Sequence, residues 1–207
     1  SLRYPLIELL LAVLSLACLL LGASRVLDSL TPWVAITVWF FPFVFCWLLI
    51  TVTFIDLEHL RIPHVLTLVG IVCGLVAAAV GGNLTGVSLT ESLLGLVAGA
   101  LPIVVLIEVW FRVFGREGMG YGDAMLMGMV GATLGWQAIP FVLMAASLQG
   151  ILISLPAWFK ARRRPEGTEG MLIPFGPFIT LGALEWMFFS EAILDRISGL
   201  LFWTAAG

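Results

Sequence analysis

Two aspartates, Asp56 and Asp123, stand at the edges of long apolar runs in a chain of 207 residues. A charged carboxylate is costly to place in lipid, so each needs a physical reason for its position. When two carboxylates approach closely, one stays protonated near neutral pH while the other acts as a base. Such a pair activates a water molecule and protonates a leaving amide. The two residues therefore predict a catalytic pair for peptide hydrolysis.

A lone aspartate at a helix end also has a simpler explanation, because an acid at a helix N-terminus caps the helix. Asp123 fits that explanation, since it is expected to begin a helix. Asp56 fits it poorly, because it is expected to end one, where the helix dipole disfavours a negative charge. We therefore expect Asp56 to be retained for a purpose other than capping.

Glycines surround Asp123 in the segment GREGMGYGDAMLMG, residues 115–128. Gly120 and Gly122 leave no side chain in the way of an extended peptide backbone, and they permit unusual φ values. One interpretation is that they bring a substrate backbone within hydrogen-bonding reach of the acid. The other is that they form a flexible turn, and the residues alone leave both open.

Composition places the chain in the membrane. It is 61% hydrophobic, only 11% charged and has a mean hydropathy of +1.11, whereas a soluble domain carries about 25% charged residues. The apolar runs are near the length that spans a bilayer. We predict an all-α polytopic transmembrane bundle forming one domain over residues 1–207, with lipid as its surroundings and, at a net charge of −3, no nucleic-acid partner. The expected spans are 5–22, 33–55, 63–80, 89–111, 123–134, 139–159 and 174–189, followed by an interfacial amphipathic helix over 191–203.

Local signals support these elements and orient them. Ser88 followed by Glu91 is a capping-box pattern and predicts a helix start at Leu89. The KARRR segment, residues 160–164, is the strongest basic cluster, and basic loops stay cytoplasmic. Counting the spans back from it puts both aspartates at the cytoplasmic edge, together with eight of the ten basic residues. These eight are Arg3, Arg61, Arg112, Arg116, Lys160, Arg162, Arg163 and Arg164.

The pattern of cysteine and histidine predicts no metal site. Cys18, Cys46 and Cys73 each lie alone inside an apolar run, whereas metal sites use clustered ligands. His59 and His64 make a poor metal pair without further ligands. The cysteines are therefore expected to face lipid or the core.

Four blocks of the chain resemble one known family. GMGYGDAML is similar to the GxGD signature of intramembrane aspartic peptidases, and FIDLEHLRIPHVLT, SLRYPLIELL and IPFGPF are similar to blocks of bacterial type IV prepilin peptidases. The resemblance implies that Asp56 and Asp123 are catalytic. It also implies cleavage of a short basic leader from prepilins, or from the pseudopilins of type II secretion, at the cytoplasmic face of the inner membrane. Bifunctional members then methylate the new N-terminus with S-adenosylmethionine, and proteolysis itself is expected to need no cofactor.

The same resemblance suggests substrate contacts. Glu58 and Glu117, with the two aspartates, would attract a basic leader; solvated loop positions are the alternative. Pro174 and Gly176 belong to the PFGP segment, residues 174–177, whose prolines restrict the backbone before the last span. They would either shape a wall of the active site or simply start a helix with proline in its first turn.

Two departures from the family pattern keep other functions open. The family usually has lysine two residues after the second aspartate, where this chain has Met125. It also often has an N-terminal domain with paired CxxC motifs, which this sequence is expected to lack. An inactive scaffold of a secretion or pilus machine is therefore an alternative. A proton-coupled transporter is another, although acids at one membrane face and the lack of an inverted repeat argue against it.

Overall fold

The computed structural model describes residues 3–27, 32–115, 120–161 and 174–205. Within these residues the chain forms seven α-helices and no β-strand, which confirms the predicted all-α bundle. The helices are α1 (Arg3–Leu27), α2 (Pro32–His59), α3 (His64–Thr85), α4 (Leu89–Phe114), α5 (Tyr121–Leu134), α6 (Ala138–Ala161) and α7 (Gly176–Ala205).

The helices differ in how much of a membrane they can cross. Over the described residues, four stretches are long and apolar enough to span it: Ile36–His59, Leu89–Phe114, Ala138–Pro156 and Gly176–Arg196. The apolar stretches Ile7–Gly22 and His64–Val80 are shorter. The 14 residues of α5 rise only about 21 Å, less than the hydrocarbon core of a bilayer. The expected span over 123–134, which corresponds to α5, is therefore too short for a full crossing.

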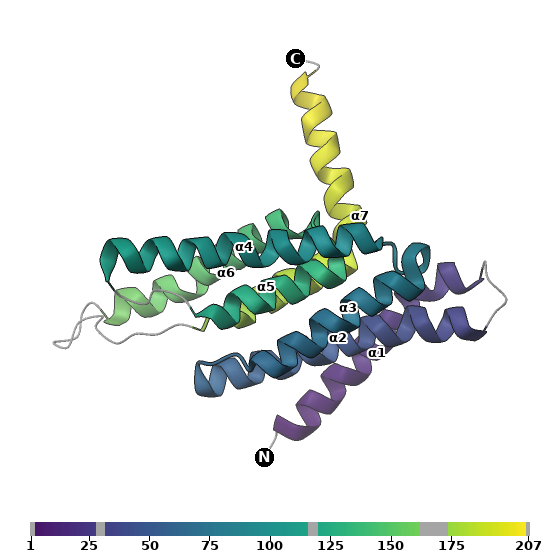
Figure 1. The fold of residues 1–207 in the computed structure, drawn as a ribbon, viewed down its shortest axis with the longest axis horizontal. Helices are drawn as coiled ribbons and strands as arrows, with labels where there is room; N and C mark the ends of the chain where they lie inside the picture. The colour runs from purple at the N-terminus through teal and green to yellow at the C-terminus, as the bar shows by residue number, and fades with distance from the viewer. Residues whose placement is uncertain (1–2, 28–31, 116–119, 162–173, 206–207) are drawn as a thin grey trace.

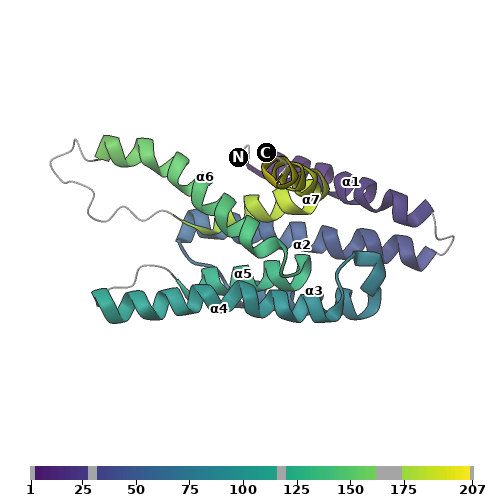
Figure 2. The same cartoon turned by 90° about the horizontal axis from the view of Figure 1, so that it is seen from above.

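Helices α2 to α6 run roughly along one axis, so the bundle has two distinct ends (Figure 1). The C-termini of α2, α4 and α6 lie at one end, and the α3–α4 connection lies at the other (Figures 1 and 2). The sequence predicts a last span over 174–189 and an interfacial helix over 191–203. In the structure both segments lie in α7, which runs to Ala205, and its C-terminal part leaves the bundle at a steep angle.

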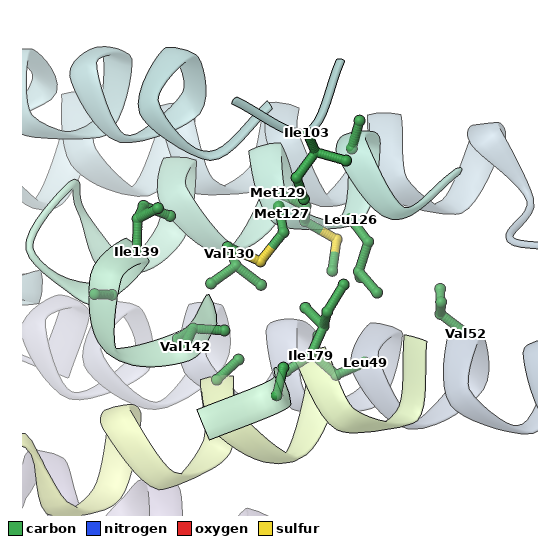
Figure 3. Close-up of a cluster of buried hydrophobic side chains, with 14 of the residues drawn as sticks. Leu49, Val52, Ile103, Leu126, Met127, Met129, Val130, Ile139, Val142 and Ile179 are labelled. Atoms are coloured by element: carbon green, nitrogen blue, oxygen red, sulfur yellow. The ribbon is translucent and has the colours of Figure 1, made fainter. Parts of the chain in front are cut away.

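Helix α5 forms the centre of the bundle, because small residues let its neighbours approach closely. On α4, Gly95 lies against the backbone of Gly131, and Gly99 lies against the Met127 carbonyl. Eight residues of α5 are buried, among them Leu126. Figure 3 shows the surrounding core, in which Leu49, Val52, Ile103, Leu126, Met127, Met129, Val130, Ile139, Val142 and Ile179 converge from five helices.

Two sets of polar side chains on the apolar helices form hydrogen bonds, one at the start of α4 and one between α6 and α7. The capping box at the start of α4 is present, with the Glu91 N–H donating to Ser88 Oγ and the Ser88 N–H donating to Glu91 Oε2. Glu185 of α7 accepts hydrogen bonds from Gln149 Nε2 of α6 at 2.8 and 2.9 Å. This bond ties α6 to α7 within the apolar part of both helices.

Candidate active site

Asp56 lies in the last turn of α2 and is only 5% exposed. Its carboxylate accepts a hydrogen bond from the backbone N–H of Gly176, with 3.0 Å between that nitrogen and Oδ2. Gly176 is the first residue of α7, and the first N–H groups of a helix have no partner within it. The N-terminus of α7 thus supplies the donor for the Asp56 carboxylate, and it also carries the positive end of the helix dipole.

This contact explains why Asp56 is tolerated where its own helix disfavours it. The C-terminal dipole of α2 opposes a carboxylate, whereas the N-terminal dipole and a free N–H of α7 favour one. Gly176 has to be glycine for the contact to form. A Cβ there would stand 2.6 Å from Asp56 Oδ2.

Asp123 lies in the first turn of α5, the position at which the sequence places it. Its N–H donates to the Gly120 carbonyl at 3.1 Å, which closes the first turn. Burial and, secondly, the nearby Asp56 carboxylate raise the pKa of Asp123 to about 6, and a backbone contact at Gly120 partly offsets the rise. A carboxyl with such a pKa changes protonation state close to neutral pH, as an acid or base catalyst must.

Both aspartates line one cavity of about 830 Å³, formed where α2, α3, α5 and the segment before α7 meet. The structure thus brings together two acids that are 67 positions apart, counting from residue 56 to residue 123. The remaining lining combines polar and apolar groups from these elements. They are Ile55, Leu60, Arg61, Ile62, Pro63, His64, Gly120, Tyr121, Gly122, Pro174 and Phe175.

The two glycines before Asp123 differ in how closely their surroundings approach them. A Cβ on Gly122 would stand 2.8 Å from the Ile62 Cβ, so this glycine lets the start of α5 pack against the segment between α2 and α3. A Cβ on Gly120 would meet nothing closer than 3.8 Å. Neither residue has a positive φ. The reason for glycine at Gly122 is therefore close packing, not an unusual backbone conformation.

Of the other predicted substrate-binding residues, two lie at the cavity and two do not or cannot be placed. Pro174 lines the cavity, and Gly176 holds Asp56. Glu58 lies on the exposed surface of α2 and is not part of the lining. Glu117 lies outside the described residues. Their roles in binding stay a prediction.

Among the lining residues, Arg61 and Tyr121 had no predicted role in the site, and Phe175 was included only as part of the PFGP segment. Arg61 follows α2, Tyr121 belongs to the glycine-rich motif itself, and Phe175 belongs to the PFGP segment. The sequence signal that could have identified them is their position inside or next to the motifs around Asp56, Asp123 and Pro174. Among the described residues, no three His, Cys, Asp or Glu side chains are grouped as metal ligands would be.

Met125, at the position where the resembled family usually has lysine, points away from the acid. Residues two apart on a helix do not share a face. The Met125 Sδ lies 2.8 Å from Nδ1 of His64, at the start of α3. The Met125 side chain therefore takes part in the α3–α5 contact.

The fold and the paired aspartates define an α-helical membrane protein with the features of an aspartic peptidase. Residues 43–155 match the type IV leader peptidase family, and the chain belongs to that family. It is 36% identical over 190 residues to the prepilin leader peptidase/N-methyltransferase of Aeromonas hydrophila, covering 90% of this chain and 59% of that protein. The proteins of the same name from Legionella pneumophila and Pseudomonas aeruginosa are each 32% identical, over 96% and 89% of this chain and 63% and 58% of theirs.

The chain thus spans about three fifths of the length of these relatives. No solved structure matches it.

Proposed function

We propose that this chain is the peptidase part of a prepilin leader peptidase and that Asp56 and Asp123 are its catalytic pair. The observation that carries the proposal is the single cavity lined by both carboxylates at one end of the bundle. The relatives' printed name supports a prepilin as substrate. Pseudopilins fit the same chemistry, and we propose that the site opens at the cytoplasmic face of the bacterial inner membrane.

The proposed reaction needs one ionised and one protonated carboxyl group. The ionised acid takes a proton from water as the water oxygen attacks the scissile carbonyl carbon, while the protonated acid donates its proton to the carbonyl oxygen. The C–N bond then breaks as the leaving nitrogen receives the proton taken from water, and the second carboxyl recovers its own from the hydroxyl. We assign Asp56, which accepts the N–H of Gly176, as the acid that is ionised before the reaction. Asp123 is then the acid that is protonated before it.

Substrate contacts follow from what surrounds the pair. Pro174 and Phe175 offer a wall on which an extended leader backbone can lie beside Asp56. Glu58 is exposed at the same end of α2, where it would meet basic leader residues before they reach the cavity. We assign Glu117 the same role from its sequence position.

The relatives' name also includes N-methyltransferase, which implies S-adenosylmethionine as methyl donor. An adenosyl group needs hydrogen-bond partners for its base and ribose. The polar lining of the cavity is the aspartate pair with Arg61, His64 and Tyr121, and no subset of it is set apart for such a group. This cavity by itself therefore does not define a methyl-donor site, and no step is assigned to that cofactor.

The proposal is tested by incubating the purified chain in lipid with a prepilin and mapping the new N-terminus by mass spectrometry. Asp56→Asn and Asp123→Asn should each reduce cleavage at least about 10³-fold while the protein stays folded, because removing one member of a catalytic pair removes nearly the whole effect. Each substitution keeps the size of the side chain and removes its titration. Full activity in either variant would rule out the pair.

A further inference from the structure

A hydrogen bond outside the aspartate pair links the helix that carries Asp123 to its neighbour. The Tyr121 hydroxyl, on the first residue of α5, donates to Glu108 Oε1 of α4 with 2.6 Å between the oxygens. Arg112, one turn further along α4, approaches Glu108 Oε2 to 3.5 Å. The short distance is typical of a hydrogen bond to an ionised acceptor. Hydrolysis as derived above uses neither Tyr121 nor Glu108.

The start of α5 lacks the usual means of holding a helix end. Its N-cap is Gly120, which offers no side-chain acceptor to the first N–H groups. Gly122 follows within the first turn, and glycine gives the backbone more freedom than any other residue. Asp123 therefore stands on a helix start without a side-chain N-cap.

Elsewhere, two glycines of α4 approach the backbone of α5 closely. Gly95 meets Gly131 and Gly99 meets Met127, both deeper along α5 than Asp123. Gly128 contacts Leu96 and Ala100 of α4. The bond between Tyr121 and Glu108 ties the start of α5 to α4, whereas the contact of Gly122 with Ile62 joins it to the α2–α3 segment.

We propose that Tyr121 and Glu108 are positioning residues that hold Asp123 at the orientation needed for cleavage. This inference rests on the proposed peptidase function. Tyr121 holds the first residue of α5, two residues before the acid, and Glu108 holds Tyr121 by accepting its hydrogen bond. Because Tyr121 also lines the cavity, the competing explanation is that its hydroxyl touches the substrate itself.

A double-mutant cycle separates the two explanations. Tyr121→Phe and Glu108→Ala should each lower kcat about tenfold with KM changed less than about threefold, since each removes one charge-assisted hydrogen bond. The double variant should be no slower than either single one, because the same bond is lost. Glu108→Gln keeps an acceptor and should retain most of the activity. Arg112→Ala is the matched control and should cleave like the parent, because its side chain is 77% exposed and exposed ion pairs contribute little.

Two outcomes would overturn the inference. One is a slow Tyr121→Phe beside an unaffected Glu108→Ala; the other is a double variant whose loss is the product of the two single losses. Either would mean that Tyr121 acts on the substrate.

Hydrogen exchange of the whole chain in lipid provides a test that needs no activity. Amides of residues 122–125 should exchange several times faster in Tyr121→Phe than in the parent, with those of α2 unchanged. Faster exchange in a chain that fails to cleave any prepilin would support the positioning role and reject the proposed function. Unchanged exchange would reject the positioning role whatever the activity.

Discussion

At the scale of single residues, the contact between Asp56 and Gly176 gives the site its asymmetry. The two acids meet different helix N-termini: Asp56 that of α7, and Asp123 that of its own helix α5. Each carboxylate thus has a partial positive charge beside it that compensates for its removal from water. Each acid also has a backbone contact that favours its ionised form: Asp56 accepts the Gly176 N–H at 3.0 Å, and Asp123 has a contact at Gly120.

Gly176→Ala tests this contact. The added Cβ would stand 2.6 Å from Asp56 Oδ2, so the carboxylate must move and lose its hydrogen bond. Cleavage should fall about 100-fold, since a misplacement of about 1 Å costs that much in a positioned site. Gly150→Ala is the control, because its Cβ would meet nothing closer than 3.5 Å. The measurement is cleavage rate per folded enzyme, and equal rates in the two variants would show that the contact is dispensable.

The coupling of the two acids predicts a pH effect with a definite sign. Asp56 is one of two causes that raise the pKa of Asp123 to about 6, so Asp56→Asn should lower that pKa and Asp123 should ionise at lower pH. In the parent, the one-proton pair is lost as pH rises through this pKa, and kcat/KM should fall there. The titration is followed by the infrared band of the protonated carboxyl, with the double Asn variant as blank. An unchanged midpoint in Asp56→Asn would mean that the carboxylates do not interact.

At the scale of elements, local signals were readable from the sequence and long-range contacts were not. The capping box at Ser88 involves residues three apart, and the start of α4 was predicted to the residue. Asp56 and Gly176 are 120 positions apart, so their contact depends on how α2 and α7 pack. The PFGP segment was expected either to wall the site or to start a helix, and it lies where both descriptions apply.

The packing of α4 on α5 was missed for the same reason. Gly95 and Gly99 form a small-residue motif within α4, but the sequence does not say which helix they meet. In the structure they meet the backbone at Gly131 and Met127, whereas Gly128 has looser contacts. The sequence also did not show that residues 191–203 continue the helix of the last span. Apolar residues at helical spacing mark a helix but not where it joins or bends away from the one before it.

Gly95→Ala and Gly128→Ala test which contact stabilises the bundle. A Cβ on Gly95 would overlap the Gly131 backbone, which cannot move aside, whereas one on Gly128 would meet the Leu96 side chain at 3.2 Å. Gly95→Ala should lower the free energy of unfolding by about 3 kcal/mol or more, and Gly128→Ala by about 1 kcal/mol at most. Denaturation in detergent measures both. A larger loss in Gly128→Ala would reverse the assignment of the close contact.

At the scale of the whole molecule, the two ends of the bundle have different chemistry. The aspartate cavity lies at the end where α2 finishes and α5 and α7 begin. Arg61 and Arg112 lie at the same end, whereas the connection from α3 to α4 lies at the other (Figure 1). By the charge bias of membrane proteins, the arginine-bearing end is expected to be cytoplasmic. A leader peptide that has not crossed the membrane would then reach the cavity directly.

Orientation is tested with one cysteine probe at each end. Glu58→Cys, in the last turn of α2, should react with a membrane-impermeant maleimide only in inverted vesicles, and Thr90→Cys, in the first turn of α4, only in intact cells. Both positions are exposed. The parent chain is the blank, since Cys18 and Cys46 are buried and Cys73 is partly so. Exchange of the two patterns would place the aspartates on the outer face, and reaction of both probes from one side would contradict the two-ended arrangement on which the proposed site depends.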